Sequence, residues 1–247
     1  MKPKIAFFDF ACCEGCQLTV TEMEDNLLDI LSQIEVVNWR EVADVRRDDY
    51  DIAFLEGSIT RPSDIARVKE IRKNAKIVVA IGACATNGGV NAIKNTFENQ
   101  DEVRRYVYGD KAILYDTFEV RPHSAVIDVD YELQGCPMDQ GEFKELFTAL
   151  LTGKTWKQKN YPVCVECKIK GNICVYDLGM TCLGPVTRAG CAALCPSKGN
   201  YCEGCRGLVD NPNTDAEKDV MEKHGLTVDD ILNRFKLFNS ISEVSGQ

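Results

Sequence analysis

Eight cysteines lie within a stretch of 42 residues, from Cys164 to Cys205. Glycine and proline are scattered through this stretch, and its apolar residues follow no sustained helical or strand period. A segment of this kind cannot build a stable core from side-chain burial alone. We therefore expect something other than apolar packing, such as a bound metal, to hold the segment together.

The N-terminal sequence and the net charge restrict the cellular location and the partners that we expect for this chain. The apolar run at residues 5–10 is interrupted by Asp9 and is too short for a signal-peptide core. The chain has no run of about 18 apolar residues, so we expect no membrane insertion. A formal net charge of −9 argues against nucleic acid as a partner. We expect a cytoplasmic protein whose thirteen cysteines are metal ligands or redox thiols rather than disulfides.

The rest of the chain divides into two parts. Apolar runs predict strands at residues 4–10, 34–39, 51–55, 76–81 and 126–129. Helical spacing predicts helices at residues 18–31, 91–106 and 140–151, with another that begins at Pro62. This alternation predicts an α/β fold, a flavodoxin-like doubly wound parallel sheet, in a domain of residues 1–155. Residues 156–247 are predicted to form a small, irregular domain that ends in short helices at 213–223 and 227–235.

The five cysteines of the first part all follow predicted strands. Cys12, Cys13 and Cys16 come after the first strand, Cys84 after the fourth, and Cys136 after the last. Because ligands bind beyond the carboxyl ends of parallel strands, this pattern indicates one iron–sulfur cluster held by four thiolates. Single buried cysteines that fill a core, a thioredoxin-type dithiol and a structural zinc are the alternatives.

The cysteines of the second part are separated by 2, 6, 7, 8, 3, 6 and 2 residues. Eight thiols divide into two sites of four, and Cys195-Pro196 resembles the Cys-Pro of ferredoxin motifs. Two zinc ribbons would need paired Cys-x-x-Cys knuckles at each site. Only Cys164-x-x-Cys167 and Cys202-x-x-Cys205 have that spacing, which favours iron–sulfur clusters over zinc.

Four motifs together carry a family resemblance. They are Cys13-x-Gly-Cys16, Gly82-x-Cys84-Ala, Gly135-Cys136-Pro137 and the segment Cys182-Leu-Gly-Pro-Val-Thr-Arg-Ala-Gly-Cys191. Their order resembles the small, electron-transfer subunit of cytosolic NiFe hydrogenases, over nearly the whole chain. The resemblance is greatest to the delta subunit of sulfhydrogenases, in the NAD(P)-linked group.

The resemblance implies three iron–sulfur clusters and assigns their ligands. The implied sets are Cys13, Cys16, Cys84 and Cys136 for a proximal cluster; Cys191, Cys195, Cys202 and Cys205 for a medial one; and Cys164, Cys167, Cys174 and Cys182 for a distal one. Cys164 stands where many respiratory members have histidine, and Cys195 adds a fourth thiol to a medial site that has three in those members. Both departures point to three 4Fe–4S clusters. Cys12 is left over, and tandem cysteines bind the cluster in the related subunit of respiratory complex I.

The implied function is electron transfer within a hydrogenase, an oxidoreductase acting on dihydrogen, whose NiFe centre lies in a separate large subunit. The other expected partner is a flavin and iron–sulfur diaphorase-type subunit that reduces NAD(P)⁺. The alternatives are a self-contained flavodoxin/ferredoxin-like carrier, a zinc-stabilised interaction module, and the related subunit of a heterodisulfide-reductase- or deazaflavin-linked hydrogenase. Glu14 and Glu56 lie near the proximal motif and are read as solvated or interface carboxylates, with tuning of the cluster as the alternative.

Overall fold

The computed structural model describes residues 2–111 and 116–241. Five strands form one sheet in the order β2-β1-β3-β4-β5, and every neighbouring pair is parallel. The strands span Lys4–Asp9 (β1), Glu35–Asn38 (β2), Ile52–Glu56 (β3), Ile77–Ile81 (β4) and Tyr131–Leu133 (β5). This is the order of flavodoxin-like folds, so the predicted fold class is confirmed.

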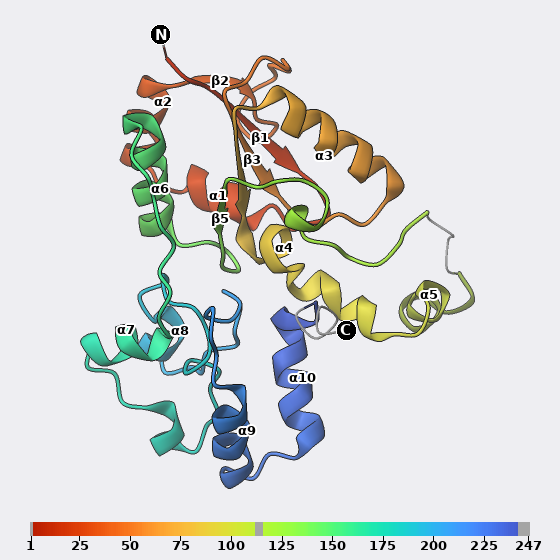
Figure 1. Ribbon diagram of the computed structural model, residues 1–247, viewed down its shortest axis with the longest axis vertical. Coiled ribbons are helices and arrows are strands. Elements are labelled where there is room, and N and C mark those ends of the chain that lie inside the picture. The colour runs from red at the N-terminus through yellow and green to blue at the C-terminus, as the bar shows by residue number, and fades with distance from the viewer. Residues whose placement is uncertain (1, 112–115, 242–247) are drawn as a thin grey trace.

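Helices cover both faces of the sheet and continue into the C-terminal part (Figure 1). The α-helices are α1 (Gly15–Thr21), α2 (Asp25–Gln33), α3 (Pro62–Asn74), α4 (Gly82–Asn87), α5 (Gln100–Tyr108), α6 (Gln140–Thr152), α7 (Val163–Ile169), α8 (Leu194–Ser197), α9 (Thr214–Lys223) and α10 (Val228–Asn239). The 3₁₀ helices are η1 (Gly89–Thr96), η2 (Gly109–Lys111), η3 (His123–Ala125) and η4 (Val175–Leu178). No helix in these residues is long and apolar enough to cross a bilayer.

The sheet is buried on both faces, which explains why its strands read as continuous apolar runs. On one face, Phe54 stacks on Phe7 with ring centroids 4.7 Å apart and packs against Phe143 of α6 at 5.6 Å. On the other face, Val68 and Ile71 of α3 belong to a second buried cluster. The two layers therefore give the first part of the chain an ample core of its own.

The C-terminal part has only small groups of apolar side chains. One buried group surrounds Val163 and Val175 and includes two of the cysteines. A second joins Leu183 and Val186 to Met221 and Ile231 of α9 and α10. Helix α10 also packs against η1 and α4, which ties the C-terminal part back to the sheet region.

Three predicted elements differ from the structure. The single helix predicted at residues 18–31 is two helices, because Glu24 adopts a positive φ of 49° after α1 ends. The helix predicted at residues 91–106 is η1 followed by α5, which starts anew where the side chain of Asn99 caps it. Residues 126–129 form no strand, since the N–H groups of Val126 and Ile127 donate to the carbonyl of His123, and β5 begins at Tyr131.

Candidate metal centres

The carboxyl edge of the sheet gathers the N-terminal cysteines as predicted. Cys13 lies in the loop after β1, Cys16 in the first turn of α1, Cys84 in α4 directly after β4, and Cys136 after β5. Gly82, at φ 83°, makes the turn from β4 into α4, and a Cβ there would overlap the Cys16 sulfur. The glycine of the Gly82-x-Cys84 motif therefore lets two of the thiols approach one another.

The pKa of each of these thiols depends on the charges of the others, which indicates which of them lie near one another. Burial raises the pKa of Cys84 to about 12, and the neighbouring charges of Cys136 and Cys13 raise it further. Burial also raises the pKa of Cys16, and Cys84 and Cys136 again contribute. Burial and then the charge of Cys13 raise the pKa of Cys136. The structure thus brings Cys13, Cys16, Cys84 and Cys136 together.

Cys12 has different surroundings from its neighbour Cys13. Burial and the charge of Glu56 raise the pKa of Cys12 to about 12, with smaller contributions from Glu14 and Asp9. The charges that raise it most are those of acids, whereas the pKa values of Cys16, Cys84 and Cys136 are raised by neighbouring thiols as well. The electrostatic surroundings of Cys12 therefore differ from those of the group of four.

The two acids near this edge have structural partners. Glu56 is 2% exposed, and its carboxylate accepts hydrogen bonds from the N–H groups of Cys16 (2.9 Å) and Gln17 (3.0 Å) at the start of α1. Burial raises the pKa of Glu56, and these two hydrogen bonds lower it. Glu14 forms an ion pair with Arg40 at the surface. Glu56 therefore anchors the helix that carries Cys16.

The four cysteines predicted for the distal site line one cavity of about 160 Å³ between α7 and η4. These are Cys164, Cys167, Cys174 and Cys182. Burial raises the pKa of Cys164 to about 12, and the other three cysteines contribute further. The remaining walls are mostly apolar, including Val163 and Val175. Four soft sulfur donors around an apolar cavity fit an iron–sulfur cluster in the chemistry of the donor set.

Hydrogen bonds point at the sulfurs of this cavity. The N–H groups of Gly184 (3.4 Å) and Cys202 (3.2 Å) donate to the Cys182 sulfur. The Asn172 amide donates to the Cys167 sulfur at 3.5 Å. At the proximal edge, the Asn91 amide lies 3.7 Å from the Cys84 sulfur. Sequence reasoning does not single out either asparagine, because a side-chain amide at such a distance from a cysteine has no periodic signal.

The cysteines predicted for the medial site lie between the other two groups. Burial raises the pKa of Cys205 to about 12, the charge of Cys191 raises it further, and the backbone of Cys136 lowers it. Burial and then the charge of Cys191 raise the pKa of Cys195. Burial also raises the pKa of Cys202, to which Cys205 and Cys182 of the distal group both contribute. This group therefore contacts the proximal group through Cys205 and the distal group through Cys202.

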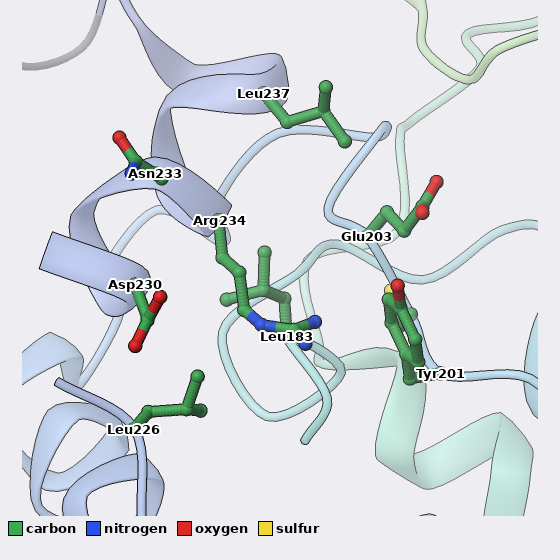
Figure 2. A pocket seen from close by; sticks show the side chains of 9 residues that line it. Leu183, Tyr201, Glu203, Leu226, Asp230, Asn233, Arg234 and Leu237 are labelled. Carbon is green, nitrogen blue, oxygen red and sulfur yellow. The ribbon is translucent and has the colours of Figure 1, made fainter. Parts of the chain in front are cut away.

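A second cavity, of about 320 Å³, lies between the cysteine-rich loops and α10 (Figure 2). Its walls include Leu183, Tyr201 and Leu237, and the Arg234 guanidinium lies 4.6 Å from the centre of the Tyr201 ring. Cys202 is its one cysteine, so this cavity does not gather a set of thiols. Within residues 2–111 and 116–241, no three His, Cys, Asp or Glu side chains are placed to hold a single metal ion.

Fold and thiol arrangement together define a class of redox protein, and sequence comparison identifies it. Residues 13–150 match the family described as NADH ubiquinone oxidoreductase, 20 Kd subunit. The chain belongs to this family, and curated proteins similar to it include hydrogenase subunits.

Two curated relatives and one solved structure illustrate the similarity. Sulfhydrogenase 2 subunit delta of Pyrococcus furiosus is 34% identical, over 83% of this chain and 86% of that protein. A subunit of the F420-non-reducing hydrogenase vhu of Methanococcus voltae is 30% identical, over 85% of this chain and 83% of that one. The crystal structure of an NAD⁺-reducing [NiFe]-hydrogenase contains a chain that is 26% identical, with a TM-score of 0.56 over 63% of this chain and 94% of its own.

Proposed function

We propose that this chain is the electron-transfer subunit of a NiFe hydrogenase and that it holds three 4Fe–4S clusters. The proposed ligands are Cys13, Cys16, Cys84 and Cys136 (proximal), Cys191, Cys195, Cys202 and Cys205 (medial), and Cys164, Cys167, Cys174 and Cys182 (distal). The observation that carries the proposal is that Cys164, Cys167, Cys174 and Cys182 line one cavity. The charges that raise the thiol pKa values also link the other eight cysteines within the two remaining sets. When bound, such clusters supply one-electron transfer, so the chain conducts electrons and contains no catalytic centre.

The proposed order of the clusters follows from the contacts between groups. Cys136 of the proximal group lies beside Cys205, and the N–H of Cys202 donates to the sulfur of Cys182 in the distal group. At each of these two contacts, a proposed ligand of one cluster lies beside a proposed ligand of the next. We place the sheet region, residues 1–155, against the large subunit that contains the NiFe centre, and residues 156–247 toward the electron acceptor.

The residues of the chain act on the clusters through burial and hydrogen bonds. Burial raises the pKa of several thiols, so metal binding must release their protons. Hydrogen bonds donated to the sulfurs of Cys182 and Cys167 stabilise the reduced, more negative cluster and raise its potential. All thirteen cysteines are free thiols in the structure, which suits the reducing cytoplasm in which we place the complex.

The acceptor that we propose first is a flavin and iron–sulfur diaphorase-type subunit that reduces NAD(P)⁺. A second candidate is favoured by the extent of the matches. The NAD⁺-reducing chain aligns over 63% of this chain, whereas the F420-non-reducing relative aligns over 85% and so spans more of it. The second candidate is therefore an assembly of that kind, with a heterodisulfide reductase as the acceptor. Dihydrogen oxidation by the purified complex with each acceptor in turn distinguishes the two.

Metal analysis of the intact complex tests the central proposal. The complex is purified anaerobically through a tag on this chain and assayed for iron, sulfide, zinc and nickel. Three four-iron clusters give about twelve irons from this chain, together with nickel from the large subunit. Four irons with two zincs, or a chain purified without nickel, would contradict it.

Two matched variants test the choice of proximal ligand. Cys12→Ser is expected to keep all the iron and most of the activity, because acids rather than thiols make the largest charge contributions to the pKa of Cys12. Cys13→Ser is expected to lose the proximal cluster, about a third of the iron of this chain. The reverse ranking would show that Cys12 is the ligand.

A further inference from the structure

A buried ion pair lies near the contact between the proposed proximal and medial cysteines. The Arg206 guanidinium donates to the carboxylate of Glu142 on α6, and the two side chains are 1% and 0% exposed. The same guanidinium donates to the carbonyl oxygens of Gln134 (2.6 Å) and Ala189 (3.0 Å). One side chain therefore connects three segments that are far apart in the sequence.

Each of these segments leads directly to a proposed cluster ligand. Arg206 follows Cys205, Ala189 comes two residues before Cys191, and Gln134 comes two residues before Cys136. Gly190, at φ 127°, lies against the pair, and a Cβ there would overlap both the guanidinium and the Glu142 carboxylate. This close approach explains why the residue before Cys191 is a glycine.

A buried ion pair contributes little net stability to a fold, because burying its charges is unfavourable. Charges that are removed from water cost several kcal/mol each, and well-packed apolar residues often stabilise as well or better. Arginine stays protonated in proteins, so the buried guanidinium requires a nearby anion. Glu142 is that anion, and its second carboxylate oxygen has no hydrogen-bond partner among the described residues.

We propose that Glu142 and Arg206 are positioning residues that fix Cys205 beside Cys136 and balance the charge next to the medial cluster, thereby setting its reduction potential. This inference rests on the proposed function, because it assumes that the medial cluster is present. Charges interact strongly in a dry interior, and net charge and hydrogen bonding set the potential of an iron–sulfur cluster.

The two charges predict shifts of opposite sign. Glu142→Gln keeps the shape of the side chain and leaves the positive charge of Arg206 uncompensated, which favours the added electron and raises the medial potential. Arg206→Gln leaves a buried carboxylate, which lowers the potential. This second shift is expected to be the smaller one, because an isolated buried carboxyl group takes up a proton. The double variant has neither charge and returns close to the wild-type potential.

The test is an anaerobic redox titration of the intact complex, followed by electron paramagnetic resonance. Glu142→Gln, Arg206→Gln and the double variant are compared with Glu145→Gln, an exposed carboxylate on the same helix. The expected result is a higher medial potential in Glu142→Gln, a lower one in Arg206→Gln, and little change in the distal potential or in the control.

Two outcomes would overturn the inference. They are an unchanged medial potential in Glu142→Gln and shifts of the same sign in both single variants. If Arg206→Gln does not fold, the isosteric Glu142→Gln still decides the question. Iron analysis of the wild type separates these outcomes from a failure of the proposed function, which would show as missing clusters before any substitution.

Discussion

The two halves of this molecule hold their cysteines in different ways. In the sheet region, a two-sided apolar core fixes the strands, and the cysteines lie at one edge of it, where Cys16 alone among them belongs to the buried core. In residues 164–205, the cysteines belong to the small apolar groups themselves, including Cys182 and Cys202. We therefore expect the proposed proximal site to be preformed by folding, and the other two proposed sites to form together with their metal.

Removal of the metal is expected to have the largest effect and to separate the two halves. Without iron, amide hydrogens in residues 164–205 should lose nearly all protection from exchange, because apolar packing there is slight. Amides of β1, β3 and β4 should keep theirs. Hydrogen exchange of the full complex, before and after anaerobic chelation, measures both. Equal loss in the two regions would show that the sheet also depends on its cluster.

A glycine substitution should remove the proximal cluster alone. Gly82→Ala places a Cβ against the Cys16 sulfur and strains a positive φ of 83°, so about a third of the iron of this chain should be lost. Gly171→Ala is the matched control, since Gly171 has a φ of 68° and open space where its Cβ would lie. Iron analysis that gives the same loss for both variants would assign the effect to backbone strain rather than to the thiol.

A buried histidine should make the sheet region sensitive to acid. His123 is fully buried, and burial lowers its pKa from 6.5 to about 4. The unfolded chain therefore binds a proton that the folded chain excludes, so stability rises with pH between about 4 and 6.5. Full protonation costs about 3 kcal/mol.

Denaturant unfolding of the full chain at pH 5 and pH 7, monitored in the sheet region, measures this effect. His123→Gln should remove the rise in stability with pH that this imidazole causes over that range. His224, which is exposed near the end of α9, provides the control, and His224→Gln should leave the dependence intact. An unchanged pH dependence in His123→Gln would show that other groups carry it.

The same comparison explains what the sequence predicts well. Strands such as β4 are recognisable because burial on both faces makes each one a continuous apolar run, and the crossover order then places five cysteines at one edge. Residues 126–129 are misassigned because Val126 and Ile127 are equally apolar but pack over the face of the sheet instead of pairing within it. An apolar run indicates burial and leaves the hydrogen-bond partner of each residue open.

The missed parts of the site are contacts between residues that lie far apart in the chain. Glu142 and Arg206 are 64 residues apart, and each is an ordinary charged residue in its local sequence. Their pairing depends on how the cysteine-rich segment folds back onto α6, which no local period encodes. The cysteines themselves are recognisable because their number and spacing carry information without any contact being known.

The smallest expected effect is a shift of cluster potential when an asparagine that donates to a cysteine sulfur is replaced. One such asparagine lies in each region of the molecule. Asn172 donates to the Cys167 sulfur at 3.5 Å and to the Ser197 hydroxyl at 3.0 Å, in the region that we expect to depend on metal. Asn172→Ala removes one hydrogen bond to a ligand and should lower the distal potential. One such bond contributes about 0.5–1.5 kcal/mol, which corresponds to roughly 20–60 mV for one electron.

Asn91 is the counterpart at the preformed edge, where its amide also donates to the carbonyl of Ala11 (2.8 Å) and the hydroxyl of Ser58 (3.0 Å). The longer distance of 3.7 Å to the Cys84 sulfur predicts a smaller shift of the proximal potential in Asn91→Ala. Redox titration of both variants in the intact complex measures the two shifts together. A larger shift at Asn91 than at Asn172 would mean that the rigid scaffold, rather than the metal-dependent segment, sets cluster potential through its hydrogen bonds.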